Sequence, residues 1–192
     1  MEGQIRDIIR QKVVDSLAAT VPPLTRRDVR LPGIPRKAVA VIGPRRGGKT
    51  TFLWQVIGER LAAGSGREGL FYFNFEDERL AGLSATDLHV VVEEFYRLHP
   101  EWRDHRKVVM LFDEIQMVAG WETFARRLLD TEQVELFLSG SSARLLSREV
   151  ATSMRGRAME ALVLPFSFRE FLRHRGQEPV LPAARLTKRT RS

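Results

Sequence analysis

The 192-residue sequence contains no cysteine, which excludes a disulfide framework, a thiolate metal site and a cysteine nucleophile. Its four histidines are scattered and show no spacing typical of metal ligands. No apolar run is longer than about six residues, whereas a membrane-spanning helix needs about 18 or more. Charged residues interrupt the first twenty positions, so they do not form the apolar core of a signal peptide. We therefore expect a single soluble, cytoplasmic domain with no membrane partner.

Acidic charge is scarce at the two ends of the chain, and the formal net charge is +7. Residues 1–49 hold eleven Lys or Arg against four Asp or Glu, and residues 173–192 hold six against one. Residues 50–172 hold fourteen against nineteen. A nucleic-acid-binding domain more often concentrates basic charge on one structured face. Nucleic-acid binding stays open, but the charge distribution does not favour it.

Short apolar runs bounded by Gly or Pro alternate with segments of helical periodicity. This alternation predicts a three-layer α/β domain with right-handed crossovers. The expected strands are residues 38–42, 70–75, 108–112, 134–138 and 158–164. The expected helices are residues 4–18, 50–63, 84–98, 121–130, 142–154 and 167–173. Residues 176–192 have few large apolar side chains, and we expect them to be disordered or only loosely attached.

The motif G-x-x-x-x-G-K-[ST] occurs at residues 43–50, directly after an expected strand and directly before an expected helix. Its glycines let the backbone curl so that N–H groups point at phosphate oxygens, and the helix adds its positive N-terminal end. Lys49 would reach the β- and γ-phosphates, and the Thr50 hydroxyl would bind Mg²⁺. The alternative is a plain glycine turn before a helix. Arg45 and Arg46 flank the loop, where they would either add positive potential or face solvent. The expected nucleotide-binding residues are Gly43, Pro44, Arg45, Arg46, Gly47, Gly48, Lys49, Thr50 and Thr51.

A pair of carboxylates, Asp113 and Glu114, follows the strand expected at 108–112. The carboxyl ends of parallel strands are where open α/β folds bind ligands. Asp113 would hold Mg²⁺ through its water shell, and Glu114 would polarise a water that attacks the γ-phosphate. Asn74 and Glu76 would lie at the same edge, where they could orient water or only form a turn. The alternative for the acidic pair is two solvated carboxylates that cap a turn.

The chain has no N-K-x-D motif for guanine, which favours ATP over GTP. The aromatic run at 71–75 lacks interleaved basic residues, so we expect it in the core rather than as a base-stacking platform. One strand separates the phosphate-loop strand from the Asp-Glu strand. Because additional-strand ATPases insert a strand there, the expected parallel order is the fifth, first, fourth, third and second strand.

Seven segments occur in an order that resembles a family of prokaryotic AAA-type ATPases. They are residues 43–51 (GPRRGGKTT), 73–77 (FNFED), 111–116 (LFDEIQ), 121 (W), 138–142 (LSGSS), 155–157 (RGR) and 164–171 (LPFSFREF). The resemblance covers about residues 5–173. It implies a P-loop NTPase fold with a five-stranded parallel sheet, ATP as the nucleotide, and a switch or motor role in a homo-oligomer or with a protein partner.

Longer members of that family continue into a lid or winged-helix segment and a C-terminal domain of unknown function, and we expect these parts to be absent here. The resemblance therefore implies three parts: an N-terminal helix and linker (1–36), an ATP-binding core (37–175) and a basic tail (176–192). It also implies a polar sensor after the fourth strand, for which Ser141 is the first choice and Ser139 the second. The alternative for these serines is capping the next helix.

In AAA proteins an arginine placed just before the fifth strand reaches the γ-phosphate of a neighbouring subunit. The resemblance assigns that role to Arg155 or Arg157, and the alternative is an arginine pair on a solvated surface. Three functions remain: an ATPase that drives conformational change, a nucleotide-gated switch with slow turnover, and a nucleic-acid helicase. The helicase ranks last because helicases pair two such cores on a much longer chain.

Overall fold

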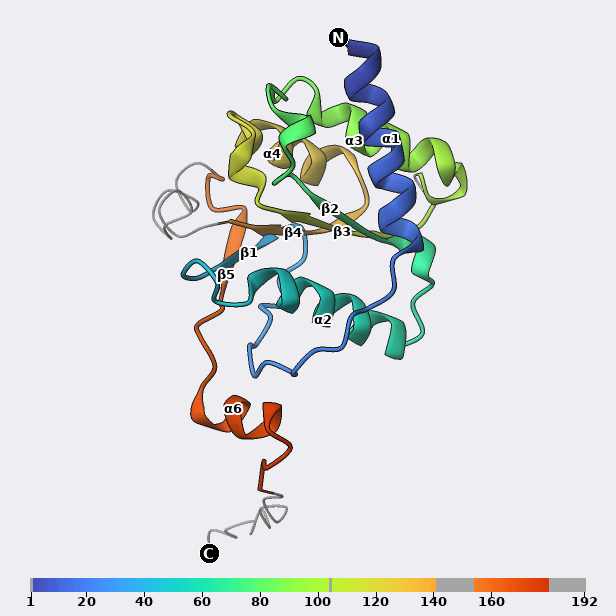
Figure 1. The fold of residues 1–192 in the computed structure, drawn as a ribbon. Helices are drawn as coiled ribbons and strands as arrows, with labels where there is room; N and C mark the ends of the chain where they lie inside the picture. The colour runs from blue at the N-terminus through green and yellow to red at the C-terminus, as the bar shows by residue number, and fades with distance from the viewer. Residues whose placement is uncertain (1, 104, 141–153, 180–192) are drawn as a thin grey trace, which may run out of the picture.

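The computed structural model describes residues 2–103, 105–140 and 154–179 (Figure 1). Within these ranges five parallel strands form one sheet in the order β2-β3-β4-β1-β5, as expected from the sequence. The strands are β1 (Ala38–Ile42), β2 (Leu70–Asn74), β3 (Val108–Asp113), β4 (Val134–Ser139) and β5 (Ala158–Leu162). The α-helices are α1 (Glu2–Ala18), α2 (Lys49–Ala62), α3 (Leu88–Leu98), α4 (Trp121–Thr131) and α6 (Phe168–His174). Single 3₁₀ turns occupy Arg67–Gly69, Glu78–Leu80, Pro100–Trp102 and Ile115–Met117.

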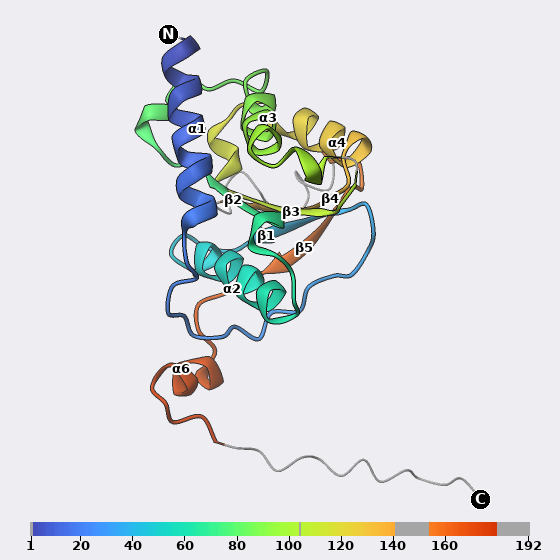
Figure 2. The same ribbon diagram turned by 90° about the vertical axis from the view of Figure 1, so that its right-hand side faces the viewer.

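Helices cover both faces of the sheet, so the domain has three layers (Figures 1 and 2). Helices α1, α3 and α4 pack on one face, and α2 packs on the other. Successive residues of a strand point to opposite faces, which explains why β1, β3 and β4 are apolar almost without interruption. The aromatic run of β2 is in the core, as expected: Phe71 and Phe73 are buried, and Phe71 stacks on Phe95 with 4.8 Å between ring centroids.

The N-terminal helix is part of this core. Ile9 and Val13 of α1 are fully buried against α3 and β2. Glu94 of α3, which is also buried, accepts hydrogen bonds from Arg6 Nε at 2.8 Å and Arg10 Nε at 3.2 Å. None of the helices in the described ranges combines the length and apolar character needed to cross a bilayer.

One expected helix begins later in the structure, one expected strand ends earlier, and one expected helix lies outside the described residues. The helix expected from residue 84 begins at Leu88, because Ser84 and Asp87 close a separate turn in which Ser84 N–H donates to the Asp87 carboxylate at 2.9 Å. Strand β5 ends at Leu162 rather than residue 164, although Val163 N–H still donates to the Ile42 carbonyl at 2.8 Å. The helix expected at 142–154 lies outside the described residues except for Met154, which is in a turn.

The last described helix, α6, projects below the body of the domain (Figure 1). It begins with a capping box, in which the Ser167 hydroxyl accepts from Glu170 N–H and the Glu170 carboxylate accepts from Ser167 N–H. Of the tail expected to be loose, residues 176–179 are described, and Glu178 there pairs with Arg173 at 2.6 Å. The rest of the tail, 180–192, lies outside the described residues.

Candidate nucleotide-binding site

The loop between β1 and α2 folds tightly against the start of the segment after β5. A Cβ atom on Gly43 would lie 2.0 Å from the Val163 carbonyl oxygen, so no other residue fits there. Gly48 has φ 92°, in the left-handed region that favours glycine, and serves as the N-cap of α2. The loop glycines therefore meet two separate needs: close backbone approach at Gly43, and an unusual backbone angle at Gly48.

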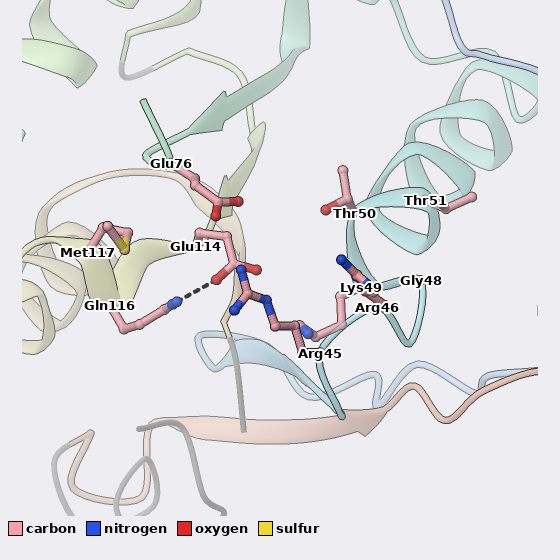
Figure 3. Close-up of a pocket in the computed structure, with 10 residues that line it drawn as sticks. All are labelled: Arg45, Arg46, Gly48, Lys49, Thr50, Thr51, Glu76, Glu114, Gln116 and Met117. Carbon is pink, nitrogen blue, oxygen red and sulfur yellow. Dashed lines mark hydrogen bonds between the residues drawn. The ribbon is translucent and has the colours of Figure 1, made fainter. Parts of the chain in front are cut away.

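The loop forms one wall of a cavity of about 550 Å³, and the segments after β2 and β3 form the opposite wall (Figure 3). Cationic side chains come from the loop, and carboxylates come from the facing wall. The lining residues are Arg45, Arg46, Gly48, Lys49, Thr50, Thr51, Glu76, Glu114, Gln116 and Met117. The cavity thus combines a positive wall suited to an anion with carboxylates suited to a cation or a proton.

Lys49 is almost completely buried, with 5% of its surface exposed. Its ammonium group donates to the carbonyl oxygens of Gly43 at 3.3 Å and Pro44 at 3.1 Å. The loop therefore holds this cation at the cavity wall with uncharged acceptors. Arg45 and Arg46 are exposed to solvent, and they also line the cavity, where they add positive charge.

Asp113 is fully buried, and both of its carboxylate oxygens accept hydrogen bonds. Oδ1 accepts from the Ser139 hydroxyl, and Oδ2 accepts from the Tyr72 hydroxyl at 2.8 Å. Burial and the negative charge of Asp113 raise the pKa of Tyr72, so this phenol keeps its proton and remains a donor. Tyr72 was not predicted as a site residue, because it lies in an aromatic run that predicts core packing. In the fold it points to the face of β2 opposite Phe71 and Phe73, where it reaches Asp113.

Glu114 lies at the cavity, in a left-handed conformation with φ 53°. Its backbone N–H donates to the Ser139 hydroxyl oxygen at 3.3 Å, and its carboxylate accepts from the Gln116 side-chain amide. Non-glycine residues in this conformation are uncommon and gather at functional sites. The acidic pair is therefore divided: Asp113 is tied into the sheet, and Glu114 faces the cavity.

Of the two candidate sensor serines, Ser139 is fully buried and contacts both members of the acidic pair. Ser141 lies outside the described residues. Asn74 accepts a hydrogen bond from Glu76 N–H at 2.7 Å, which forms the turn considered from the sequence and places Glu76 at the cavity wall.

Arg155 and Arg157 lie away from the cavity, before β5. The Arg157 carbonyl accepts from Ala38 N–H at the start of β1, at the edge of the sheet opposite the phosphate loop. Its guanidinium pairs with Asp130 at the end of α4, and 42% of the side chain is exposed. Arg155 is exposed with φ 49°. The fold therefore directs neither arginine at the cavity of its own chain.

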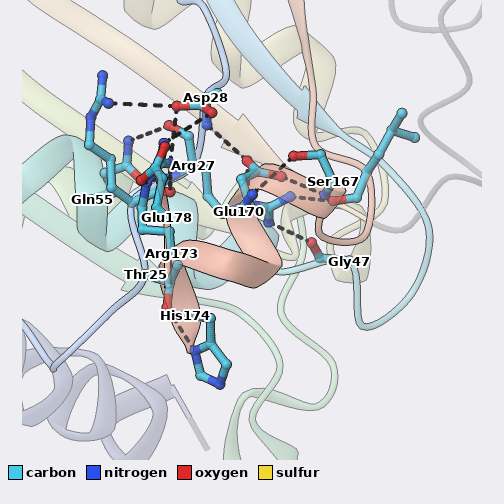
Figure 4. A network of polar contacts seen from close by, with 12 residues as sticks. Thr25, Arg27, Asp28, Gly47, Gln55, Ser167, Glu170, Arg173, His174 and Glu178 are labelled. Carbon is cyan, nitrogen blue, oxygen red and sulfur yellow. Dashed lines mark hydrogen bonds and ion pairs between the residues drawn. The ribbon is translucent and has the colours of Figure 1, made fainter. Parts of the chain in front are cut away.

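A buried ion pair behind the loop was not found from the sequence (Figure 4). Arg27 of the linker is 3% exposed; its Nε donates to Glu170 of α6 at 3.0 Å and its Nη1 donates to the Gly47 carbonyl at 3.0 Å. Gln55 of α2 brackets the Arg27 backbone, accepting from its N–H at 2.6 Å and donating to its carbonyl at 3.1 Å. The S-x-x-E pattern at 167–170 was a readable signal for the helix cap, but no sequence pattern pairs Glu170 with an arginine 143 residues away.

Metal ligands contributed by side chains are few. Within the described ranges, no group of three or more His, Asp or Glu side chains could hold a metal ion. The Thr50 hydroxyl and the Asp113 carboxylate are oxygen donors of the kind that Mg²⁺ prefers, and Mg²⁺ usually takes its other ligands from phosphate and water. The residues present fit a magnesium ion that enters with a nucleotide.

A protein-family model described as an AAA domain matches residues 35–172. The chain belongs to this AAA domain family. It is 36% identical over 167 residues to an uncharacterized protein of Methanocaldococcus jannaschii, covering 86% of this chain and 35% of that protein. An uncharacterized protein of Haemophilus influenzae is 34% identical over 133 residues, covering 69% of this chain and 32% of that protein. The chain thus spans about a third of the length of these relatives.

Among solved structures, this AAA domain is similar to Cdc6p from Pyrobaculum aerophilum, with a TM-score of 0.47 and 15% identity over 73% of this chain and 42% of that one. It is also similar to PCH-2 of C. elegans, with a TM-score of 0.42 and 10% identity over 82% of this chain and 41% of that one.

The stability that the Arg27–Glu170 ion pair contributes depends on pH, because Glu170 must be ionised to form the pair. Burial alone would raise the pKa of Glu170, but hydrogen bonds from the N–H groups of Asp28 and Ser167 and from the Arg27 guanidinium outweigh it and lower the pKa to about 2. Because the folded pKa lies below the ordinary value of 4.5, the stabilisation is complete above pH 4.5 and is lost as the pH falls toward 2.

We predict that Glu170→Gln lowers the free energy of unfolding at pH 7 by about 2 kcal/mol, the scale of a hydrogen bond to a charged group. The difference from the parent should narrow as the pH falls from 5 to 2, because the parent loses the same charge. Urea unfolding at several pH values measures both quantities. Glu160→Gln, at an exposed position of β5, is the control and should follow the parent throughout. A gap that stays constant with pH would contradict the prediction.

Proposed function

We propose that this AAA domain binds Mg·ATP and hydrolyses it, and that hydrolysis drives a conformational change in an oligomer or a partner. The observation that carries the proposal is the cavity itself, in which the phosphate loop faces Glu114 from the opposite wall. Membership of the AAA domain family supports it. The matched region spans about a third of the length of these relatives, so the proposed activity is that of the domain alone.

Phosphate binding follows from the loop. The backbone N–H groups at the start of α2 and the positive end of the helix favour an anion at the cavity. The Lys49 ammonium, now held by two neutral carbonyls, gains a stronger acceptor in a phosphate oxygen, because charge-assisted hydrogen bonds are shorter and stronger. Nucleotide binding therefore replaces the weak acceptors of a buried cation.

The metal would be held by Thr50 directly and by Asp113 through water, since both Asp113 oxygens already accept hydrogen bonds from Ser139 and Tyr72. When bound there, Mg²⁺ would supply positive charge that stabilises the phosphates. Ser139 and Tyr72 fix the orientation of the Asp113 carboxylate in the sheet. Ser139, the second sensor candidate, would thus act through Asp113 and Glu114 rather than by contact with the nucleotide.

Glu114 is the proposed general base. Its backbone is fixed through Ser139, and its carboxylate is oriented by the Gln116 amide. A carboxylate at the cavity wall, across from the Lys49 side of the loop, is placed to take a proton from a water that attacks the γ-phosphate. The ADP and phosphate that form would leave through the open side of the cavity.

A slow nucleotide-gated switch is the second candidate. The observation that favours it is the position of Arg155 and Arg157 at the opposite edge of the sheet, which leaves the γ-phosphate without either of them in the same chain. A single chain would then bind ATP and hydrolyse it slowly. The rate measured as a function of protein concentration separates the two candidates.

The first prediction concerns the ligand. We expect calorimetry to show that the chain binds Mg·ATP in preference to Mg·GTP, and that Lys49→Ala abolishes binding because it removes the cation that meets the phosphates. Lys107→Ala is the control, since Lys107 is exposed and pairs with Glu135 away from the cavity. Equal affinities for ATP and GTP would contradict the nucleotide assignment.

The second prediction concerns the base. Glu114→Gln keeps the size and hydrogen bonding of the side chain but removes its charge, so ATP should still bind while hydrolysis falls at least ~10²-fold. Phosphate release under saturating ATP measures the rate, and Glu101→Gln at an exposed turn is the matched control. If Glu114→Gln hydrolyses ATP as fast as the parent, Glu114 is not the base.

The third prediction concerns a second subunit. If Arg157 acts on a neighbour, specific activity should rise with protein concentration, and inactive Lys49→Ala and Arg157→Ala chains should restore activity when mixed. Loss of Arg157 should reduce the rate by ~10³-fold or more where it acts as a finger. Asp130→Ala separates the roles, because it removes the ion-pair partner but leaves the arginine. Equal effects of Arg157→Ala and Asp130→Ala, without rescue on mixing, would assign Arg157 to the surface.

A further inference from the structure

The peptide that joins Gly47 to Gly48 lies at the centre of the phosphate loop. Two adjacent glycines impose little preference on the orientation of the peptide between them, because each has wide access to φ and ψ. In a trans peptide the C=O and N–H point in opposite directions, so the direction of the Gly47 carbonyl fixes the direction of the Gly48 N–H. An outside contact is needed to hold this peptide in one orientation.

Arg27 supplies that contact. Its Nη1 donates to the Gly47 carbonyl at 3.0 Å, and the same nitrogen lies 2.9 Å from where a Cβ on Gly48 would be. Gly48 lines the nucleotide cavity, whereas Arg27 lies behind the loop and does not line it. The Gly47 carbonyl therefore points away from the cavity, and the Gly48 N–H points toward it.

The guanidinium is itself held from three other directions. Nε donates to Glu170 at 3.0 Å, Nη2 donates to the Leu164 carbonyl, and the Phe166 ring covers the group with its centroid 4.9 Å away. A planar guanidinium can serve these acceptors together, which a lysine ammonium on a flexible stem cannot do in the same geometry. With 3% of its surface exposed, Arg27 is held rigidly in place.

We propose that Arg27 is a positioning residue for nucleotide binding, which fixes the Gly47–Gly48 peptide so that its N–H faces the phosphates, and that Glu170 of α6 keeps Arg27 in this position. The proposal rests on the proposed ATP-binding function. Helix α6 would then support the nucleotide site through Glu170 and Arg27, although it does not touch the nucleotide. A movement of α6 that took Glu170 away would release the loop peptide and lower the affinity for ATP.

The first test compares two arginines that donate to backbone carbonyls, the buried Arg27 and the half-buried Arg67. Arg27→Met should weaken Mg·ATP binding by about 10-fold or more, the loss expected for a hydrogen bond to a charged group, and Arg27→Lys should restore part of it. Arg67 is the matched control, because it also donates to backbone carbonyls, those of Ser16, Ala19 and Leu70, but lies far from the loop. Arg67→Met should destabilise the fold yet leave the affinity of the folded protein within about twofold.

The second test compares two buried glutamates that accept from arginines. Glu170→Gln should weaken Mg·ATP binding, whereas Glu94→Gln, which loosens the contacts with Arg6 and Arg10, should not. This comparison keeps the proposal testable if Arg27→Met does not fold. The backbone amide chemical shift of Gly48, measured by NMR without nucleotide, gives an independent readout. It follows the orientation of the Gly47–Gly48 peptide, so it should change in Glu170→Gln but not in Glu94→Gln.

The outcomes separate the two proposals. If the parent chain binds no Mg·ATP but Glu170→Gln still changes the Gly48 amide shift, the ATP-binding function is contradicted and the positioning of the loop by Arg27 is supported. If the parent binds Mg·ATP and Glu170→Gln and Arg27→Lys bind it as tightly as the parent, with an unchanged Gly48 amide shift, the positioning role is overturned. Weaker binding confined to the Arg27 and Glu170 variants supports it.

Discussion

The parallel pairing of the five strands is the constraint on which the rest of the structure depends. Because β1 lies between β4 and β5 and runs in the same direction, the carboxyl ends of all the strands meet at one edge of the sheet. The phosphate loop leaves β1 at this edge; Ser139 ends the adjacent strand β4, and Asp113 ends β3, the next strand along. Residues far from the loop in the sequence are thereby brought to the same edge of the sheet. The helices on both faces bury the strands and keep this edge fixed.

Two buried charges at that edge, Lys49 and Asp113, are hydrogen-bonded only to uncharged groups in the contacts described above. The Lys49 cation has neutral carbonyls as acceptors, and Asp113 has hydroxyl donors rather than a cation. Each charge is hydrogen-bonded, as buried charges must be, but neither has a partner of opposite sign among these contacts. A magnesium nucleotide carries both missing partners. Behind the loop the opposite holds: Arg27 and Glu170 are paired with each other, which suits a fixed support rather than a binding surface.

Much of this could be predicted from the sequence, because the signals were local. The run Ala38–Ile42 followed by the glycine-rich motif predicted β1, the loop and α2, and analogy with additional-strand ATPases predicted the sheet order. The missed residues depend on contacts distant in sequence or on the face of a strand. In the sequence Arg27 is one of five charged residues in the linker at 19–36, and only the folded chain pairs it with Glu170. Tyr72 reads as part of an aromatic core, yet it faces α2 and reaches Asp113. The late start of α3 was missed because Ser84 and Asp87, which resemble a helix cap, close a turn of their own.

The central claim is that the loop at 43–50 is a phosphate cradle whose amides face the cavity. Backbone amide chemical shifts, followed by NMR while Mg²⁺ and a non-hydrolysable ATP analogue are added, test it most directly. The account predicts large, saturable shifts at Gly47, Gly48, Lys49 and Thr50, with smaller ones at Glu114, and none of them in Lys49→Ala. Saturable shifts elsewhere in the domain, with the loop amides unmoved, would contradict it.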